Sequence, residues 1–261
     1  MTNEMTIKQL GFCTDNGAGE RARIGLLVLG SDQTMEWEMR MMTHLPGVSF
    51  YHSRLANDVL VTPKNLTKME SELPLAAELL PSYLKLSALG YGCTSGATFI
   101  GEARVREILQ DTHLGVPVTD PLTAAKAAFN AMGVHRIGLV TPYTANVTKA
   151  MQKRFDAANI KINIIGSFYE ENDEIVGRIE KASILDAAIS LGRSDEVDGI
   201  FISCTSLRAA EIIEQAEETL GKPVTASNHA LAWHLLRLAG ISDELDGFGS
   251  LFKLQAIKTR V

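Results

Sequence analysis

The two halves of this chain carry the same landmarks at nearly the same spacing. The tetrapeptide Arg-Ile-Gly-Leu occupies residues 23–26 and returns at 136–139, an offset of 113 residues. The triplet Cys-Thr-Ser occupies residues 93–95 and returns at 204–206, an offset of 111 residues. A strand-like run at 48–50 has a counterpart that begins near residue 161. This spacing predicts two βα halves of similar topology, which can pack about a pseudo-twofold axis with equivalent strand ends facing each other.

Short apolar runs alternate with helical segments along both halves. The first run, at 23–30, is almost continuously apolar, which is typical of a strand buried on both faces of a parallel sheet. The alternation predicts a parallel α/β fold with right-handed crossovers. Strands are expected over residues 23–30, 48–51, 87–91, 136–140, 161–167, 199–203 and 224–226. Helices are expected over residues 35–43, 66–80 with an interruption at Pro74, 97–110, 122–132, 145–157, 182–191, 207–219 and 228–238.

Both Cys-Thr-Ser triplets follow a predicted strand and precede a predicted helix. In open α/β sheets, ligands sit beyond the carboxyl ends of the strands, where the next helix offers free N–H groups. That environment binds carboxylates or phosphates and lowers the pKa of a thiol. A thiolate at Cys93 or Cys204 can abstract a proton or attack carbon, and the opposite thiol can return a proton. We therefore interpret Cys93 and Cys204 as facing catalytic groups of one active site.

Two other interpretations of these triplets stay open. Free cysteines are among the most buried residues, so both thiols could be structural. The glycines in Gly90-x-Gly92-x-x-x-Gly96 come close to a dinucleotide fingerprint. The spacing is one residue too long, however, and the second triplet lacks the glycines.

Composition and charge narrow the classes of partner. The net charge is −6, and no Lys/Arg-rich run is present, which argues against nucleic acid. No apolar run reaches the roughly 18 residues of a membrane span, and the first residues are polar, unlike a signal peptide. None of the three cysteines has metal-type spacing. We expect a cytoplasmic protein without a metal, with its thiols reduced.

These motifs resemble the aspartate/glutamate racemase superfamily, in particular its maleate isomerase and arylmalonate decarboxylase branch. The resemblance covers roughly residues 21–240 and rests on residues 23–28, 92–96, 140–143 and 203–208. It implies two similar flavodoxin-like αβα domains related by a pseudo-twofold axis, with the active site between them. It also implies that no cofactor is used and that a small carboxylate lies between the two thiols.

The resemblance also suggests roles for individual residues. In racemases of the superfamily the two cysteines act as base and acid on opposite faces of a carbon. In maleate isomerases the first cysteine adds to the double bond, the carbon–carbon bond rotates, and the thiol leaves. Decarboxylases of this branch keep only the second cysteine, so Cys93 argues against decarboxylation. Tyr143 matches a substrate-binding tyrosine, and Asn172 is a candidate for a carboxylate-binding asparagine; both could instead be structural, as a pocket wall and a loop cap.

One residue departs from the maleate isomerase pattern. Those enzymes carry asparagine in a Ser-Asn-Thr context after the first strand, where this chain has Asp32 in Ser-Asp-Gln-Thr. An ionised Asp32 would repel a substrate carboxylate and would suit an ammonium group. It could also be an auxiliary base or merely cap the next helix. The departure favours an amino-acid-like substrate, as suggested for the racemase-like proteins of ectoine utilisation, which this chain also resembles.

The sequence therefore predicts a cofactor-independent isomerase or racemase of a small carboxylic acid, acting as a homo-oligomer. Backbone N–H groups and four hydroxyls are expected to bind the substrate, those of Thr94, Ser95, Thr205 and Ser206. The predicted domains are 1–119 with 229–261, and 120–228. Alternatives are a non-catalytic carboxylate-binding protein, a protein whose thiols form a redox-responsive disulfide, and a decarboxylase of a malonate-type acid.

Overall fold

The computed structural model describes residues 7–81 and 83–256. Eight strands form two four-stranded sheets, and every neighbouring pair is parallel. The first sheet has the order β2-β1-β3-β4 and the second β6-β5-β7-β8. The first is formed by β1 (Ala22–Leu29), β2 (Val48–Leu55), β3 (Ala88–Gly92) and β4 (Val118–Thr119). The second is formed by β5 (Arg136–Thr141), β6 (Lys161–Ser167), β7 (Gly199–Ile202) and β8 (Val224–Ala226). The identical order in both sheets confirms the repeat of similar α/β halves.

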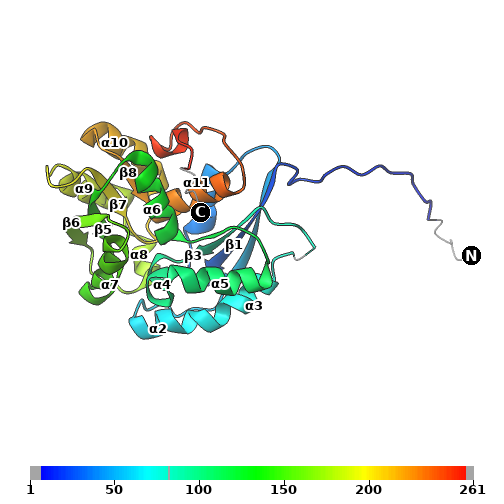
Figure 1. Ribbon diagram of the computed structural model, residues 1–261, viewed down its shortest axis with the longest axis horizontal. Coiled ribbons are helices and arrows are strands. Elements are labelled where there is room, and N and C mark those ends of the chain that lie inside the picture. The colour runs from blue at the N-terminus through cyan, green and yellow to red at the C-terminus, as the bar shows by residue number, and fades with distance from the viewer. Residues whose placement is uncertain (1–6, 82, 257–261) are drawn as a thin grey trace, which may run out of the picture.

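Helices cover the sheets (Figure 1). Those of the first half are α1 (Met35–Met42), α2 (Pro63–Lys68), the 3₁₀ helix η1 (Met69–Glu72), α3 (Leu73–Glu78), α4 (Thr94–Ile100) and α5 (Glu102–Thr112). Those that follow are α6 (Pro121–Met132), α7 (Ala145–Asp156), α8 (Asp173–Val176), α9 (Lys181–Gly192), η2 (Ala210–Ile212), α10 (Ile213–Leu220), α11 (Ser227–Leu238) and η3 (Leu251–Lys253). Helix α11 packs against α6, against α1 and against β3 of the first sheet. In the described part of the chain, no helix is long and apolar enough to cross a membrane.

The repeated tetrapeptide has a packing cause. A Cβ at Gly25 would lie 2.9 Å from side-chain carbons of Leu80, Leu86 and Leu89, and one at Gly138 would lie 2.7 Å from Ile200. Real Cβ atoms do not approach so closely, so both central strands need glycine where the layer above presses on them. The residues around these glycines in β1 and β5 are buried, as expected for central strands of a parallel sheet.

Three helix predictions need correction. The helix expected over 97–110 is two helices, α4 and α5, because Gly101 has a φ of 99° and breaks the ladder. The segment 66–80 contains α2, η1 and α3 in succession. The helix expected from residue 207 begins only at 210, as η2, and continues as α10. The chain directly after β7 is therefore irregular, and this changes the surroundings of the second cysteine.

Candidate active site

Cys93 lies at the junction between β3 and α4, where it is the N-cap residue of the helix. Its Sγ atom accepts the N–H of Gly96 at 3.2 Å and lies 3.6 Å from the hydroxyl of Ser95. The side chain is buried, with 2% exposure. Gly96 has to be glycine, because a Cβ there would lie 2.2 Å from the hydroxyl of Tyr91. The five residues around Cys93 therefore contain the end of a strand, a helix N-cap whose acceptor is sulfur, and a close packing contact.

Cys204 lies just beyond the end of β7 and is also buried, with 4% exposure. Its φ is 148°, a conformation that residues other than glycine rarely adopt. Helix η2 starts only at Ala210. The prediction that both thiols sit at a helix start is therefore correct for Cys93 and wrong for Cys204.

A serine that was not among the predicted site residues joins the two cysteine boxes, which are the Cys-Thr-Ser triplets at 93–95 and 204–206. Ser227 begins α11, directly after β8, and is fully buried. Its hydroxyl oxygen accepts the Oγ1–H of Thr94 at 2.8 Å and the amide N–H of Cys204 at 3.0 Å. The end of β3 and the end of β7 are therefore tied through one side chain. A serine between the last strand and the last helix was the available signal, since that is a preferred capping position.

Tyr143 follows β5 and is buried. Its pKa lies well above the ordinary value, mainly because of burial and then because of the charges of Cys204 and Cys93. The Tyr143 side chain in turn acts against the rise in the pKa of Cys204. Tyr143 is therefore a neighbour of Cys204, and the charge of Cys93 also acts on it.

Burial controls the ionisation of the two thiols. It raises the pKa of Cys93 to about 11, although hydrogen bonds from Ser95 and Gly96 favour the thiolate. It raises the pKa of Cys204 further, and the negative charge of Asp173 adds to the effect. The expectation of a lowered thiol pKa is therefore wrong for the protein without a ligand, because desolvation outweighs the helix N–H groups.

Asp32 is buried with 2% exposure at the loop between β1 and α1. Its Oδ1 atom accepts the N–H of Thr34 at 2.8 Å and of Met35 at 2.7 Å, so it caps α1. Its Oδ2 atom is buried and has no hydrogen-bond partner among the described residues. Burial raises the pKa of this carboxyl. The Oδ1 atom of Asp32 therefore stabilises the start of α1, whereas the Oδ2 atom makes no such contact within the described part of the chain.

Asn172 and its neighbour Asp173 have different surroundings, and Asn172 makes the loop cap that was one of its two predicted roles. Asn172 forms an isolated bridge with Leu60, and its Oδ1 atom accepts the N–H of Glu174 at 2.9 Å, so it caps α8. Asp173 is the side chain that faces the thiols, since its charge raises the pKa of both. It is 6% exposed, and its own pKa is raised to about 6 by burial and by Asp32. The residue types at 172 and 173 alone did not indicate which of the two side chains would act on the thiols.

The four predicted hydroxyls are all buried, with exposures between 1% and 3%. Thr94 donates to Ser227, and Ser206 donates to Asp173 at 3.2 Å, so these two hydroxyls hold the architecture. Ser95 lies against the Cys93 sulfur. The Thr205 hydroxyl acts against the rise in the pKa of Asp32. Ser95 and Thr205 are the two that have no hydrogen bond holding them to the surrounding scaffold among the described residues.

Glu38 supports the irregular segment after Cys204. Its carboxylate accepts the N–H of Ala210 and the side-chain amide of Asn228, each at 2.8 Å. The same amide also donates to the carbonyl of Thr205. Burial raises the pKa of Glu38 to about 7. A carboxylate from the first half therefore shapes the second cysteine box.

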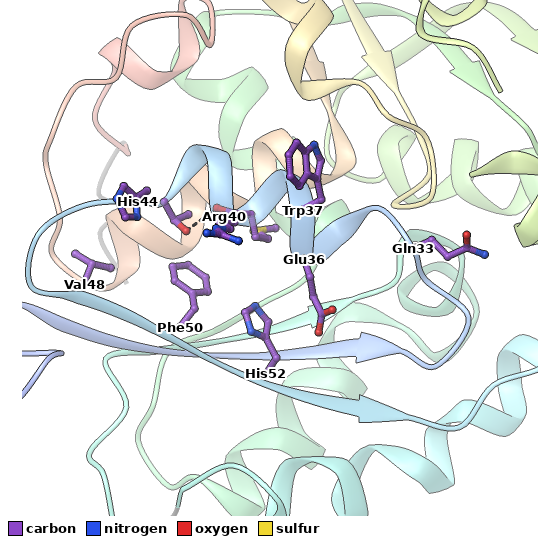
Figure 2. Close-up of a pocket in the computed structure, with 10 residues that line it drawn as sticks. Gln33, Glu36, Trp37, Arg40, His44, Val48, Phe50 and His52 are labelled. Carbon is purple, nitrogen blue, oxygen red and sulfur yellow. Dashed lines mark hydrogen bonds between the residues drawn. The ribbon is translucent and has the colours of Figure 1, made fainter. Parts of the chain in front are cut away.

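One surface cavity lies away from both thiols. It has a volume of about 550 Å³ and lies between α1 and β2. Figure 2 shows Glu36 and Arg40 of α1 above Phe50 and His52 of β2. Neither cysteine lines this cavity. The thiols are enclosed instead, and in the described residues no group of three or more His, Cys, Asp or Glu side chains could hold a metal ion.

Comparison with known proteins places this arrangement in a family. The family model for arylmalonate decarboxylase matches residues 88–252, more than half of the chain. The maleate isomerase of Nocardia farcinica is 28% identical over 247 residues, which is 91% of this chain and 98% of that protein. The maleate isomerase of Alcaligenes faecalis is 23% identical over 243 residues, 88% of this chain and 95% of that protein.

A solved structure shares the fold. It is a mutant of the Nocardia farcinica maleate cis-trans isomerase with a covalently bound succinylcysteine intermediate. The TM-score is 0.81 at 24% identity, with 89% of this chain and 98% of that chain covered. The chain belongs to the arylmalonate decarboxylase family, in the branch of the aspartate/glutamate racemase superfamily that includes the maleate isomerases.

Proposed function

We propose that this protein is a cysteine-dependent isomerase of a small carboxylic acid, with Cys93 and Cys204 acting on the substrate from two sides. The observation that carries the proposal is the joining of the two cysteine boxes by one buried serine. Ser227 accepts a hydrogen bond from each box, and the charges of both thiols act on Tyr143. A substrate between the thiols can lose or gain a proton, or form a bond to sulfur, on either face.

The surroundings of the thiols support different roles for them. Cys93 has the pKa that is raised less, and the N–H of Gly96 is positioned to stabilise its thiolate. Cys93 is therefore the base or nucleophile. Cys204 holds its proton more strongly, so it is the opposing acid. A bound ligand whose polar groups take the place of the excluded water would lower the free-energy cost of ionising Cys93.

Two reactions use this arrangement. In a racemisation, the Cys93 thiolate takes a proton from one face of a carbon next to a carboxylate, and Cys204 returns one to the other face. In a cis-trans isomerisation, Cys93 adds to a carbon–carbon double bond, the resulting single bond rotates, and the thiolate leaves. The maleate isomerase relatives and the succinylcysteine in one of them support the second type of step for this family.

The substrate carboxylate needs donors. Backbone N–H groups of the two cysteine boxes, with the hydroxyls of Ser95 and Thr205, are the donors we assign to it. Burial of these groups strengthens each interaction and protects a carbanion or enediolate from water. Cys93 argues against the decarboxylase alternative, because decarboxylases of this branch keep only the second cysteine.

Isotope exchange tests the proposal. Candidate acids, including maleate and amino acids with a second polar group, are incubated with the protein in D₂O and followed for deuterium uptake and conversion. Cys93→Ala and Cys204→Ala should each abolish conversion, and Cys13→Ala is the matched control because that cysteine is exposed. Unchanged exchange in both site variants would refute the catalytic role of the thiols. Binding without any turnover would favour the carboxylate-binding alternative.

Three features of the molecule as a whole belong to the same proposal. We infer a cytoplasmic homo-oligomer, and domains composed of residues 1–119 with 229–261 and of residues 120–228. The packing of α11 against α1 and β3 supports the return of the chain to the first domain. Its additional contact with α6 spans the proposed boundary.

A further inference from the structure

The candidate site contains two carboxylates that come from different halves of the chain. Asp32 follows β1, and Asp173 begins α8 after β6. The two interact, since the charge of Asp32 raises the pKa of Asp173, and both charges raise the pKa of Cys204. Ser31, the residue before Asp32, and Ser206, two residues after Cys204, both donate to the carboxylate of Asp173. The two carboxylates therefore lie close to each other and to the second cysteine. A pair of buried like charges is costly unless a ligand or a proton compensates it.

Asp173 is held in place from both halves. Ser31 donates to its Oδ2 atom and Ser206 to its Oδ1 atom, each at 3.2 Å. The Ser31 hydroxyl is itself oriented by the side-chain amide of Asn57 at 2.8 Å. The backbone N–H of Asp173 donates to the carbonyl of Val59 at 3.0 Å, and this bond joins the segment before α2 to the start of α8. The position of this carboxylate is thus built by several specific bonds.

Compensation for Asp32 within the protein is incomplete. Its Oδ2 atom is buried and lacks a partner in the parts of the chain that the structure describes. Arg54 is a cation whose charge acts on Asp32. Its guanidinium, however, donates to the carbonyls of residues 29, 30 and 32 and to Glu36. The ion pairs within residues 7–81 and 83–256 include neither Asp32 nor Asp173.

We propose that Asp32 and Asp173 form a binding site for a substrate ammonium group, so that the substrate is a small carboxylic acid that also carries a protonated amine. The inference rests on the proposed function, because it places the ligand between the same two thiols. An ammonium group brings a positive charge and three N–H donors, which suit the free Oδ2 atom of Asp32 and the carboxylate of Asp173. A dicarboxylate would instead add two negative charges to a site that already holds two. The pair is a specificity determinant, separate from the thiols that carry out the chemistry.

Binding measurements on the full chain test this without requiring turnover. Aspartate is compared with succinate, and 2-aminobutyrate with butyrate, by isothermal titration. The aminated acid of each pair should bind about tenfold tighter or more, as expected for a charge pair with little solvent around it. Asp32→Asn and Asp173→Asn should each remove most of that preference. Glu36→Gln is the control, because it makes the same change of charge on α1 at a residue that pairs with Arg54 and lines the surface cavity, which neither cysteine lines.

A covalent probe gives a result even if none of these acids binds. In a Cys13→Ser background, the buried thiols are treated with a cationic reagent, 2-aminoethyl methanethiosulfonate, and with its anionic sulfonatoethyl counterpart. The cationic reagent should modify Cys93 and Cys204 faster, relative to free cysteine, and this ratio should fall in Asp32→Asn and Asp173→Asn and persist in Glu36→Gln. Equal relative rates in the parent protein, or a ratio that neither aspartate variant changes, would overturn the ammonium site.

The two proposals fail in different ways. A preference for aminated ligands with neither isotope exchange nor conversion of any acid would refute the isomerase and leave the ammonium site in place. Turnover of acids without an amine, with dicarboxylates bound at least as tightly as aminated acids, would refute the ammonium site and leave the isomerase. A protonated carboxyl pair without cation preference also contradicts the ammonium site, and it would be seen as dicarboxylate binding that Asp173→Asn leaves unchanged.

Discussion

The amide N–H of Cys204 donates to the hydroxyl of Ser227 at 3.0 Å, and this bond holds the second catalytic candidate in its unusual backbone conformation. The same oxygen accepts the hydroxyl of Thr94, the residue after the first cysteine. Ser227 therefore couples the positions of two sequence elements that lie 111 residues apart. A role for both thiols in one reaction depends on this coupling.

Ser227→Ala should lower both stability and activity. The change leaves a buried amide N–H and a buried hydroxyl without their acceptor, which costs about 1–3 kcal/mol for each orphaned group. Urea unfolding should show the loss, and turnover should fall more than the loss of folded protein explains, because Cys204 is no longer anchored. Ser71→Ala, on an exposed residue that only bonds the carbonyl of Lys68, is the control and should be near neutral. Normal turnover per folded molecule in Ser227→Ala would contradict the anchoring role.

Asp173→Asn should stabilise the protein while impairing its function. The folded-state pKa of Asp173 is raised from 3.8 to about 6, so its ionisation opposes folding. That cost is absent below the unfolded value, grows as pH rises toward 6, and is full above it, reaching up to about 3 kcal/mol from the size of the shift. Unfolding free energies of the variant and parent should therefore diverge between pH 4 and pH 7 and stay apart above it. Asp195→Asn, on an exposed residue, is the matched control. An Asp173→Asn variant less stable than the parent at pH 8 would contradict the cost of ionising Asp173.

Alkylation of Cys93 should be strongly pH dependent in the protein without a ligand. Its pKa is raised to about 11, so the reactive thiolate fraction should rise about tenfold per pH unit below that value. Iodoacetamide, which is uncharged, applied to the Cys13→Ser protein and followed by peptide mass spectrometry measures this. Asp173→Asn should shift the profile to lower pH, because the charge of Asp173 is one cause of the raised pKa. A rate that is already constant between pH 7 and pH 9 would show an ionised thiol and refute the expectation.

Gly96→Ala should disturb the first cysteine without replacing a catalytic group. The added Cβ would lie 2.2 Å from the Tyr91 hydroxyl and 3.0 Å from the Cys93 sulfur, so one of them must move. Overpacking of this kind costs about 1–3 kcal/mol, which thermal unfolding would detect. Turnover should fall as well because Cys93 is displaced from its N–H donor. Gly11→Ala is the matched control, since a Cβ there meets nothing within 4 Å, and equal stability of the two variants would contradict the packing argument.

Local pattern was enough to predict the repeated α/β halves and the two cysteine boxes. Strand periodicity and the spacing of the landmarks depend on residues close together in sequence, and each central strand is buried in the way its apolar run indicates. The break at Gly101 was within reach of the same reasoning, because glycine in a helical run is a recognised interruption.

The rest was decided by tertiary contacts. The start of α10 is delayed beyond Cys204, where Glu38 from the first half satisfies the N–H of Ala210. Asn172 caps α8 and the charge of Asp173 acts on both thiols, because a bridge to Leu60 and two serine hydroxyls from opposite halves set that turn. The sequence by itself determined two matching sheets with a cysteine at the end of a central strand in each. Only the folded molecule decided which carboxylates lie beside those thiols and how strongly burial holds their protons, since both depend on neighbours that are distant in the sequence.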